Sequence, residues 1–127
     1  MQTLTPAILC AVAIGGALGS VLRFIISNWF LLRQGDGFPL GTLSVNWLGC
    51  FAIGVVVAWI NSKTTGELWR PLLVVGLLGG LTTFSAFSLE FFFLLKRDLS
   101  LALLYLLLSL AGCVLLTYIG YSLVARG

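Results

Sequence analysis

The nine residues GGLTTFSAF, at positions 79–87, place two glycines and three hydroxyl side chains inside a long apolar stretch. Glycine costs a helix about 1 kcal/mol relative to alanine, and Thr and Ser hydroxyls can bond backbone groups that a helix leaves free. The stretch therefore predicts a broken helix whose freed backbone groups find nearby partners. A helix interface built from small residues is the alternative interpretation.

The composition around this stretch is that of a membrane protein. Of 127 residues, 60% are apolar and 9% are charged, which lies outside the range of soluble globular domains. Four stretches each exceed or approach the roughly 20 residues that cross a bilayer: 4–32, 41–60, 71–95 and 99–125. We expect one all-α transmembrane domain over residues 1–127, with four membrane-spanning helices and the third broken mid-membrane. The first apolar run continues past any small-residue cleavage site, so we expect it to be retained.

Several kinds of chemistry are disfavoured by the sequence. Cys10, Cys50 and Cys113 lie inside the predicted spans without CxxC spacing, and the chain has no His. A disulfide framework or a zinc site is therefore not expected, and the cysteines are interpreted as small buried hydrophobic residues. No hydrolase, kinase or dinucleotide-binding motif is present. We expect neither an enzyme nor a nucleic-acid partner.

Basic residues are balanced between the two sides that four spans define. Each side has three, namely Lys63, Arg70 and Arg126 against Arg33, Lys96 and Arg97. Cytoplasmic loops normally carry an excess of Lys and Arg, so two interpretations stay open. The chain inserts in both orientations, and opposite copies pair about a two-fold axis in the membrane plane, or a modest bias selects one orientation.

The first two spans contain polar side chains at membrane depth. Gly15, Gly16, Gly19 and Ser20 form small-xxx-small pairs that favour close helix packing. Arg23 either snorkels to the headgroups or faces inward to hold an anion or a carboxylate. Asn46, on one helical face with Thr42, is either an interhelical hydrogen-bonding group or a pore-lining amide donor.

The third span continues with aromatic rings and one carboxylate. Phe84, Phe87 and Phe91 have helical spacing, with Ser88 one turn from Phe84. Such a stripe is usually packing surface, although the electropositive ring edges can also favour an anion. Glu90 is the only carboxylate inside a span, so it should be partnered, protonated or close to water.

The fourth span has a polar track at successive steps of four residues, made of Tyr105, Ser109, Cys113 and Thr117. Single hydroxyls in a helix often bond back to their own backbone. A series on one face is more typical of a lined path. The spans together therefore favour a pathway for an ion or a small polar solute.

At this point the chain resembles the CrcB or Fluc family of fluoride channels over essentially all four spans. The resemblance is carried by GGLTTFSAF followed by Ser88 and Glu90, by GxxxR ending at Arg23, by GTLSVNWLG around Asn46, and by LAGC around Gly112. It implies a multi-pass protein of the cytoplasmic (inner) membrane that lets toxic cytoplasmic fluoride leave passively. It also implies a dual-topology homodimer with antiparallel subunits, two fluoride pathways and a structural sodium ion at its centre.

The resemblance also implies roles for individual residues. The sodium ligands would be the backbone oxygens of Gly79 and Thr82. The fluoride pathway would comprise Asn46 as a pore amide, Phe84 and Phe87 as pathway rings, Ser88, Tyr105 and Ser109 as polar lining, and Arg23 and Glu90 towards opposite ends of the route. The chain departs from the family's commonest form at Ala86 and Cys113, where relatives have hydroxyl side chains.

Two other classes compete with the channel. A small multidrug-type proton-coupled exporter is also a four-span dual-topology dimer, but it typically needs a carboxylate in its first helix. Here the first helix has Arg23, and the carboxylate is Glu90 in the third. A membrane adaptor that transports nothing would leave Asn46 and the polar track of the fourth span without a purpose.

Overall fold

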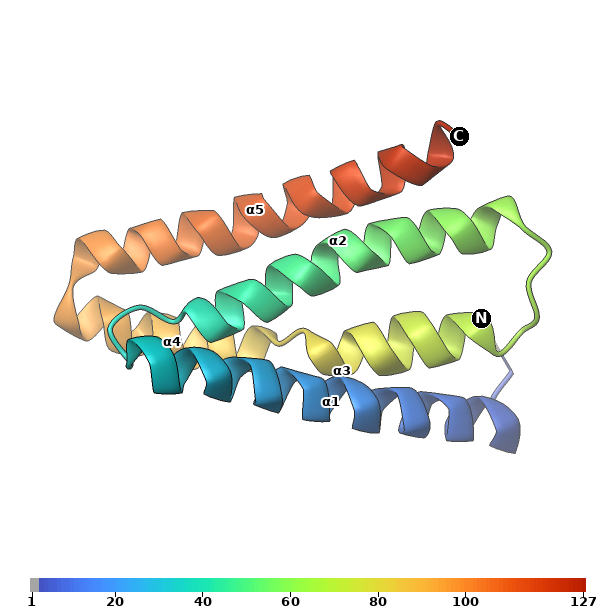
Figure 1. The fold of residues 1–127 in the computed structure, drawn as a ribbon, viewed down its shortest axis with the longest axis horizontal. Helices are drawn as coiled ribbons and strands as arrows, with labels where there is room; N and C mark the ends of the chain where they lie inside the picture. Colours follow the sequence, from blue (N-terminus) through green and yellow to red (C-terminus); the bar gives the residue numbers. More distant parts are fainter. Residues whose placement is uncertain (1–2) are drawn as a thin grey trace.

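A computed structural model describes residues 3–127, and in this part of the chain the regular structure is entirely helical (Figure 1). Four helical stretches of these residues are long and apolar enough to cross a membrane. Helices α1 (Pro6–Gln34), α2 (Leu40–Ser62) and α5 (Leu99–Ala125) form three of them. The fourth consists of the π-helical segment η1 (Arg70–Leu78), α3 (Gly79–Leu81) and α4 (Phe84–Arg97). Met1 and Gln2, which the expected domain includes, lie outside the described residues.

Local sequence explains where the helices begin. Thr5 caps α1 by accepting a hydrogen bond from the Ile8 N–H at 3.3 Å, and Pro6 occupies the first turn, where its missing N–H costs nothing. Asp98 caps α5 through its Oδ1, which accepts from the N–H groups of Ser100 and Leu101. Asp98 is also the single residue between α4 and α5, and its extended backbone separates the two helices.

The third span loses regular helix inside GGLTTFSAF. Helix α3 ends at Leu81, and Thr82 and Thr83 have extended backbone, with φ/ψ of −83°/155° and −151°/124°. Helix α4 then begins at Phe84, where the Thr83 hydroxyl caps it by accepting from the Ala86 N–H at 3.2 Å. Thr82 therefore follows the end of one helical run, and Thr83 caps the start of the next.

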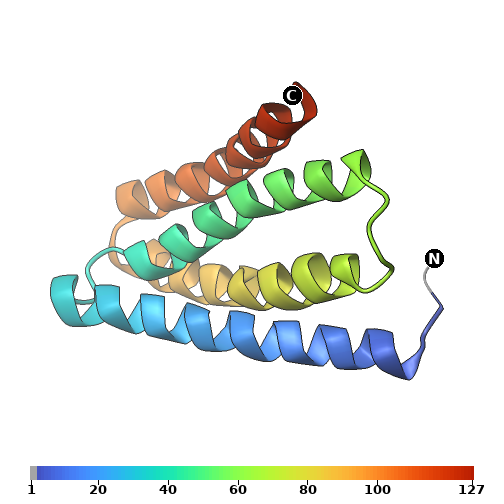
Figure 2. The ribbon, with the colours of Figure 1, turned by 45° about the vertical axis from the view of Figure 1, so that its right-hand side comes forward.

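The spans are arranged as two side-by-side pairs. Helix α1 packs along η1 and α3, whereas α2 packs mainly against α5. Figures 1 and 2 show that the start of α1, the end of α5 and the connection from α2 to η1 lie at one end of the bundle, with the two other connections at the opposite end. The connections therefore alternate between the two ends, as the comparison of Lys and Arg on the two sides of the membrane assumed.

Glycines set the close spacing within each pair. A Cβ on Gly76 would lie 2.8 Å from the Val12 carbonyl oxygen, and one on Gly80 would lie 2.7 Å from that of Gly16. In the second pair, a Cβ on Gly54 or Gly120 would likewise meet the backbone of the facing helix. The packing role expected for the first span is confirmed at Gly15 and Gly19, where an added Cβ would clash with the Leu72 and Leu77 carbonyl oxygens of the third span.

The buried core is small, and large apolar side chains are exposed on every span. One cluster gathers Phe87 and Tyr105 with Leu43, Leu94 and Ala102, and a second gathers Val45, Leu78 and Leu81. Exposed apolar surface on every span is what lipid or another subunit would cover.

We predict that Gly19→Ala destabilises the protein although alanine favours helix formation. The added Cβ would lie 2.8 Å from the Leu81 nitrogen and closer still to the Leu77 carbonyl. Overpacking of this kind costs about 1–3 kcal/mol, which exceeds the gain of about 1 kcal/mol in helix propensity. Thermal unfolding in detergent should show a lower midpoint.

Gly37→Ala is the matched control, because its Cβ would meet nothing within 4 Å. A midpoint for Gly19→Ala as high as that of the control would contradict the packing described here.

Candidate functional site

The side-chain amide of Asn46 pairs with the peptide unit of Thr83. Its Oδ1 accepts from the Thr83 N–H at 2.7 Å, and its Nδ2 donates to the Thr83 carbonyl at 3.0 Å. Because Thr83 is extended, these two backbone groups have lost their helical partners, and Asn46 replaces both. An amide NH₂ has two donor hydrogens, so one N–H of the buried Asn46 remains for another acceptor.

Arg23 also reaches the interruption from α1. Its Nε donates to the Gly80 carbonyl at 3.0 Å, and the side chain is half-buried. Of the two interpretations that the sequence left open, the inward-facing one is therefore found. The group that it binds within the described residues is a backbone carbonyl, where the sequence suggested an anion or a carboxylate.

Backbone accounting leaves further carbonyl oxygens free at the interruption. Arg23 donates a hydrogen bond to the Gly80 carbonyl, and Asn46 donates one to the Thr83 carbonyl. The carbonyls of Gly79 and Thr82 receive no hydrogen bond from any described residue. Gly79 is exposed and Thr82 is half-buried. Unpaired carbonyls in a membrane-spanning segment need a partner from outside this chain.

Glu90 is held by hydroxyl groups from two other helices. Its Oε1 accepts from Thr42 Oγ1 on α2 and its Oε2 from Tyr105 OH on α5, each at 2.7 Å. Tyr105 is fully buried and its ring packs against Phe87, with centroids 5.1 Å apart. The carboxylate is thus partnered, which is one of the three environments expected for it.

A cavity of about 250 Å³ lies between α2, the third span and α5. Its walls include Asn46, Phe84, Phe87 and Ser109, together with Cys50, Thr82, Thr83, Leu110, Cys113 and Val114. Ser109 is only 5% exposed, and its Oγ has no hydrogen-bond partner among the described residues. The cavity therefore contains one buried hydroxyl that the protein itself leaves unpaired.

A second cavity, of about 410 Å³, lies on the α1 side of the interruption and is lined by both Arg23 and Glu90. Their expected positions towards opposite ends of a route stay a prediction. Glycine-mediated packing of α1 against the third span brings Arg23 beside Gly80. Thr83 lines both this cavity and the one that contains Ser109.

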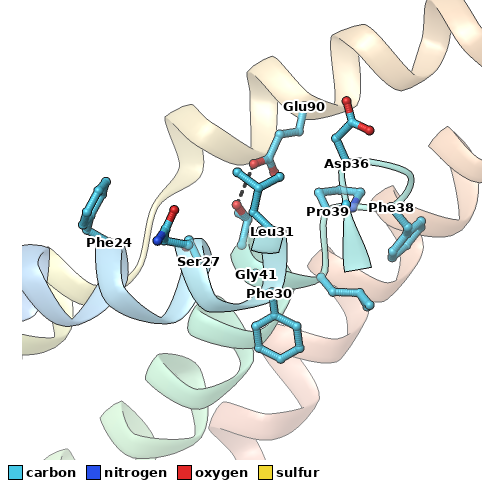
Figure 3. Close-up of a pocket in the computed structure, with 13 residues that line it drawn as sticks. Phe24, Ser27, Phe30, Leu31, Asp36, Phe38, Pro39, Gly41 and Glu90 are labelled. Atoms are coloured by element: carbon cyan, nitrogen blue, oxygen red, sulfur yellow. Dashed lines mark hydrogen bonds between the residues drawn. The ribbon is translucent and has the colours of Figure 1, made fainter. Parts of the chain in front are cut away.

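Glu90 also lines two cavities near the end of the bundle that bears the α1–α2 connection. Figure 3 shows one of them, of about 300 Å³, where Glu90 projects from α4 and Asp36 lies in the connecting loop. The other, of about 310 Å³, is lined by the same two carboxylates and by Arg97. Glu90 therefore lines these two cavities as well as the cavity that contains Arg23.

The aromatic stripe divides into buried and exposed members. Phe87 is 4% exposed and Phe84 is 70% exposed, with their ring centroids 5.4 Å apart, and both line the cavity with Ser109. Ser88 is exposed on the outer face of α4 and lines none of the four cavities described. The structure brings every other proposed pathway residue to a cavity or to the Glu90 cluster.

Three residues of this region were not among the predicted site residues, namely Thr42, Cys50 and Thr83. Helical spacing contained a signal for two of them, because Thr42, Asn46 and Cys50 follow one another at steps of four on α2. Thr83 had no such signal, since its role depends on the loss of helix at its own peptide.

Comparison with known proteins identifies relatives along nearly the whole chain. A model of CrcB-like protein, Camphor Resistance (CrcB), matches residues 10–121. The chain is 44% identical over 117 residues to a Fluoride-specific ion channel FluC of Xylella fastidiosa (strain 9a5c), covering 91% of this chain and 82% of that protein. It is 46% identical over 114 residues to the protein of the same name from Shewanella amazonensis, covering 89% and 92%. A third such relative, from Rhizobium johnstonii, is 50% identical over 92 residues, covering 72% and 74%.

We predict that Asn46→Ala unpairs both backbone groups of Thr83. Each buried group left without a partner costs about 1–3 kcal/mol, so the backbone amide of Thr83 should exchange with deuterium about ten- to a hundred-fold faster. Hydrogen exchange followed by mass spectrometry of the peptide that contains Thr83 measures this directly.

Asn28→Ala is the matched control, because Asn28 is exposed on α1 and lines a cavity that includes none of residues 79–83. Unchanged protection of the Thr83 amide in Asn46→Ala would show that the pairing does not stabilise the interruption.

Proposed function

This chain belongs to the CrcB-like family and is a multi-pass membrane protein, and on that premise we propose that it is a fluoride-selective channel of the cytoplasmic (inner) membrane. In this proposal, fluoride that has accumulated in the cytoplasm leaves passively, without coupling to a proton. The relatives named as fluoride-specific channels support this assignment. Within the molecule, one observation carries it.

That observation is the unpaired hydroxyl of Ser109 in a cavity that contains other donors. A buried hydroxyl without a partner costs about 1–3 kcal/mol, and an anion that accepts its hydrogen bond would recover this cost. Asn46, which has a second N–H, lines the same cavity, as do Phe84 and Phe87, whose rings have electropositive edges. Fluoride is small and strongly hydrated, so its route must replace waters with close donors yet release the ion.

Charged side chains near this route are engaged by neutral groups. Glu90 would repel an anion, but hydrogen bonds from the Thr42 and Tyr105 hydroxyls disperse the charge of its carboxylate. Tyr105 therefore contributes to the pathway indirectly, by stabilising Glu90. Arg23 contributes positive potential on the other side of Thr83 while its Nε holds the Gly80 carbonyl. The proposed pathway thus includes six residues that line a cavity, namely Arg23, Glu90, Asn46, Phe84, Phe87 and Ser109. It also includes Tyr105, which acts through Glu90, and Ser88, which is exposed on α4.

Exposed polar groups on the third span support the proposal of an antiparallel homodimer. Nine and three residues of this span precede the extended pair and fourteen follow it, which supports a break near mid-membrane. Gly79, Ser85 and Ser88 are exposed there, where lipid would be a poor partner. A second, inverted copy about a two-fold axis would cover them, and the balanced basic residues are compatible with both orientations.

A structural sodium ion at this two-fold axis is part of the proposal. The free backbone oxygens of Gly79 and Thr82 fit such an ion, because hard cations prefer oxygen ligands and interrupted membrane helices present carbonyls to ions. Two subunits would supply two such oxygens each. When bound, the ion would supply fixed positive charge that offsets the cost of an anion in low dielectric.

Liposomes loaded with fluoride test the function directly. The purified protein should release fluoride quickly with no proton gradient, as followed with a fluoride electrode, and chloride-loaded vesicles should retain their anion. Efflux that requires a proton gradient would favour the alternative, a small multidrug-type exporter. No flux in either condition would favour an adaptor that transports nothing.

We predict that Ser109→Ala separates flux from stability. The Ser109 hydroxyl has no partner among the described residues, so its removal should leave the unfolding midpoint unchanged or higher. Fluoride efflux should nevertheless fall about tenfold or more, since a hydrogen bond to a charged group is worth about 1.5–3 kcal/mol.

Ser122→Ala, on the same helix but outside the cavity, is the control and should retain its flux. Normal efflux in Ser109→Ala would remove this hydroxyl from the pathway.

We predict that the channel depends on sodium. If N-methylglucamine replaces Na⁺ throughout purification and reconstitution, fluoride efflux should fall, because carbonyl oxygens that face one another without a cation repel. Addition of Na⁺ to both sides should restore the rate. Efflux that is indifferent to Na⁺, from a protein that retains no Na⁺, would remove the ion from the proposal.

A further inference from the structure

Cys50 and Cys113 lie near each other on the packed helices α2 and α5. The Thr117 hydroxyl donates to the backbone carbonyls of both cysteines, each at 3.0 Å. Gly54 and Gly120 allow this approach, because a Cβ on either would meet the facing backbone. One hydroxyl that spans both carbonyls fixes the two cysteines in register.

Both cysteines also line one cavity. Cys50 and Cys113 are half-buried in the wall of the cavity that contains Ser109. Cys10 differs in every respect, since it is exposed on α1 and lines none of the four cavities described. The pair therefore has both proximity and access.

We propose that Cys50 and Cys113 form a two-coordinate binding site for a soft divalent metal ion, with Hg²⁺ as the probe. Thiolates are the ligands that soft metal ions select. On binding, each S–H bond gives its proton to water and each sulfur forms one bond to the metal, with no change of oxidation state. Two thiolates and a divalent ion make a neutral unit, which a low-dielectric cavity accepts more readily than a charged one.

Occupation of this site has a consequence for transport, which rests on the proposed function. The metal would lie in the cavity that also contains Ser109, Asn46 and Phe87, so it would obstruct an anion that passes there. Binding itself makes no such assumption. The two statements are therefore tested by separate measurements.

The binding experiment uses the full chain with Cys10→Ser, which removes the exposed thiol. We expect one Hg²⁺ per subunit, the sulfur-to-mercury charge-transfer absorbance of a dithiolate, and release of two protons per ion. Adding Cys50→Ser or Cys113→Ser should weaken retention against a competing monothiol more than about 100-fold, because loss of a ligand exceeds the 10–100-fold cost of losing an outer partner. Serine keeps the side chain's size, and size-exclusion profiles check that each variant remains folded.

Two results would overturn the site. Binding of two Hg²⁺ per subunit would mean that the thiols act independently, as ordinary buried cysteines. Retention that is equal in the single-cysteine variants would mean that no bidentate site exists.

Fluoride efflux then tests the consequence, with each variant compared with its own rate before Hg²⁺. Block in Cys10→Ser that disappears when Cys50→Ser is added would place the cavity on the route. Tight dithiolate binding with undiminished efflux would leave the metal site intact and overturn the assignment of this cavity to the pathway. If the protein conducts no fluoride at all, the binding result still decides the site.

Discussion

The pairing of Asn46 with the peptide of Thr83 is the constraint on which the rest of the polar interior depends. In a membrane-spanning segment, a backbone group that leaves its helix must find another partner or cost several kcal/mol. Asn46 supplies a donor and an acceptor from one side chain, so Thr83 can remain extended. Because Thr83 is extended, its hydroxyl can cap α4. Phe84 and Phe87 then lie on a new helix, which begins at Phe84.

The charged groups inside the spans are stabilised on the same principle, by neutral partners at short range. Arg23 binds a carbonyl that the interruption has released, and Glu90 accepts two hydroxyl hydrogen bonds. A direct ion pair between them would cancel their fields and fill the space between α1 and α4 with their own side chains. Kept apart, they leave a cavity with a guanidinium and a carboxylate in its walls.

Close packing by glycine determines where open space can exist. Backbones that touch at Gly76 and Gly80 on one side, and at Gly54 and Gly120 on the other, make two tight pairs of spans. Polar side chains and the cavity of Ser109 lie between the pairs, where Asn46 crosses from α2 to the third span. The same tight contact of α2 with α5 aligns Cys50 with Cys113, so the metal site proposed for them depends on backbone packing more than on the cysteines' own neighbours in sequence.

The sequence by itself determined the four apolar stretches, the small residues that pack them and the polar positions inside them. These follow from length, hydropathy and helical spacing, which are local properties. Only the tertiary structure decided the partner of each polar group. Arg23 faces inward to Gly80 and shares a cavity with Glu90, because α1 lies along the third span. Ser109 is left unpaired among the described residues while Thr117 is not, although both lie on the same track of α5. The Thr117 hydroxyl donates to the Cys50 carbonyl of the facing helix and to the Cys113 carbonyl of its own helix. Spacing along one helix fixes the face on which a side chain lies, but hydrogen bonds between helices depend on which residues of the neighbouring helix reach that face.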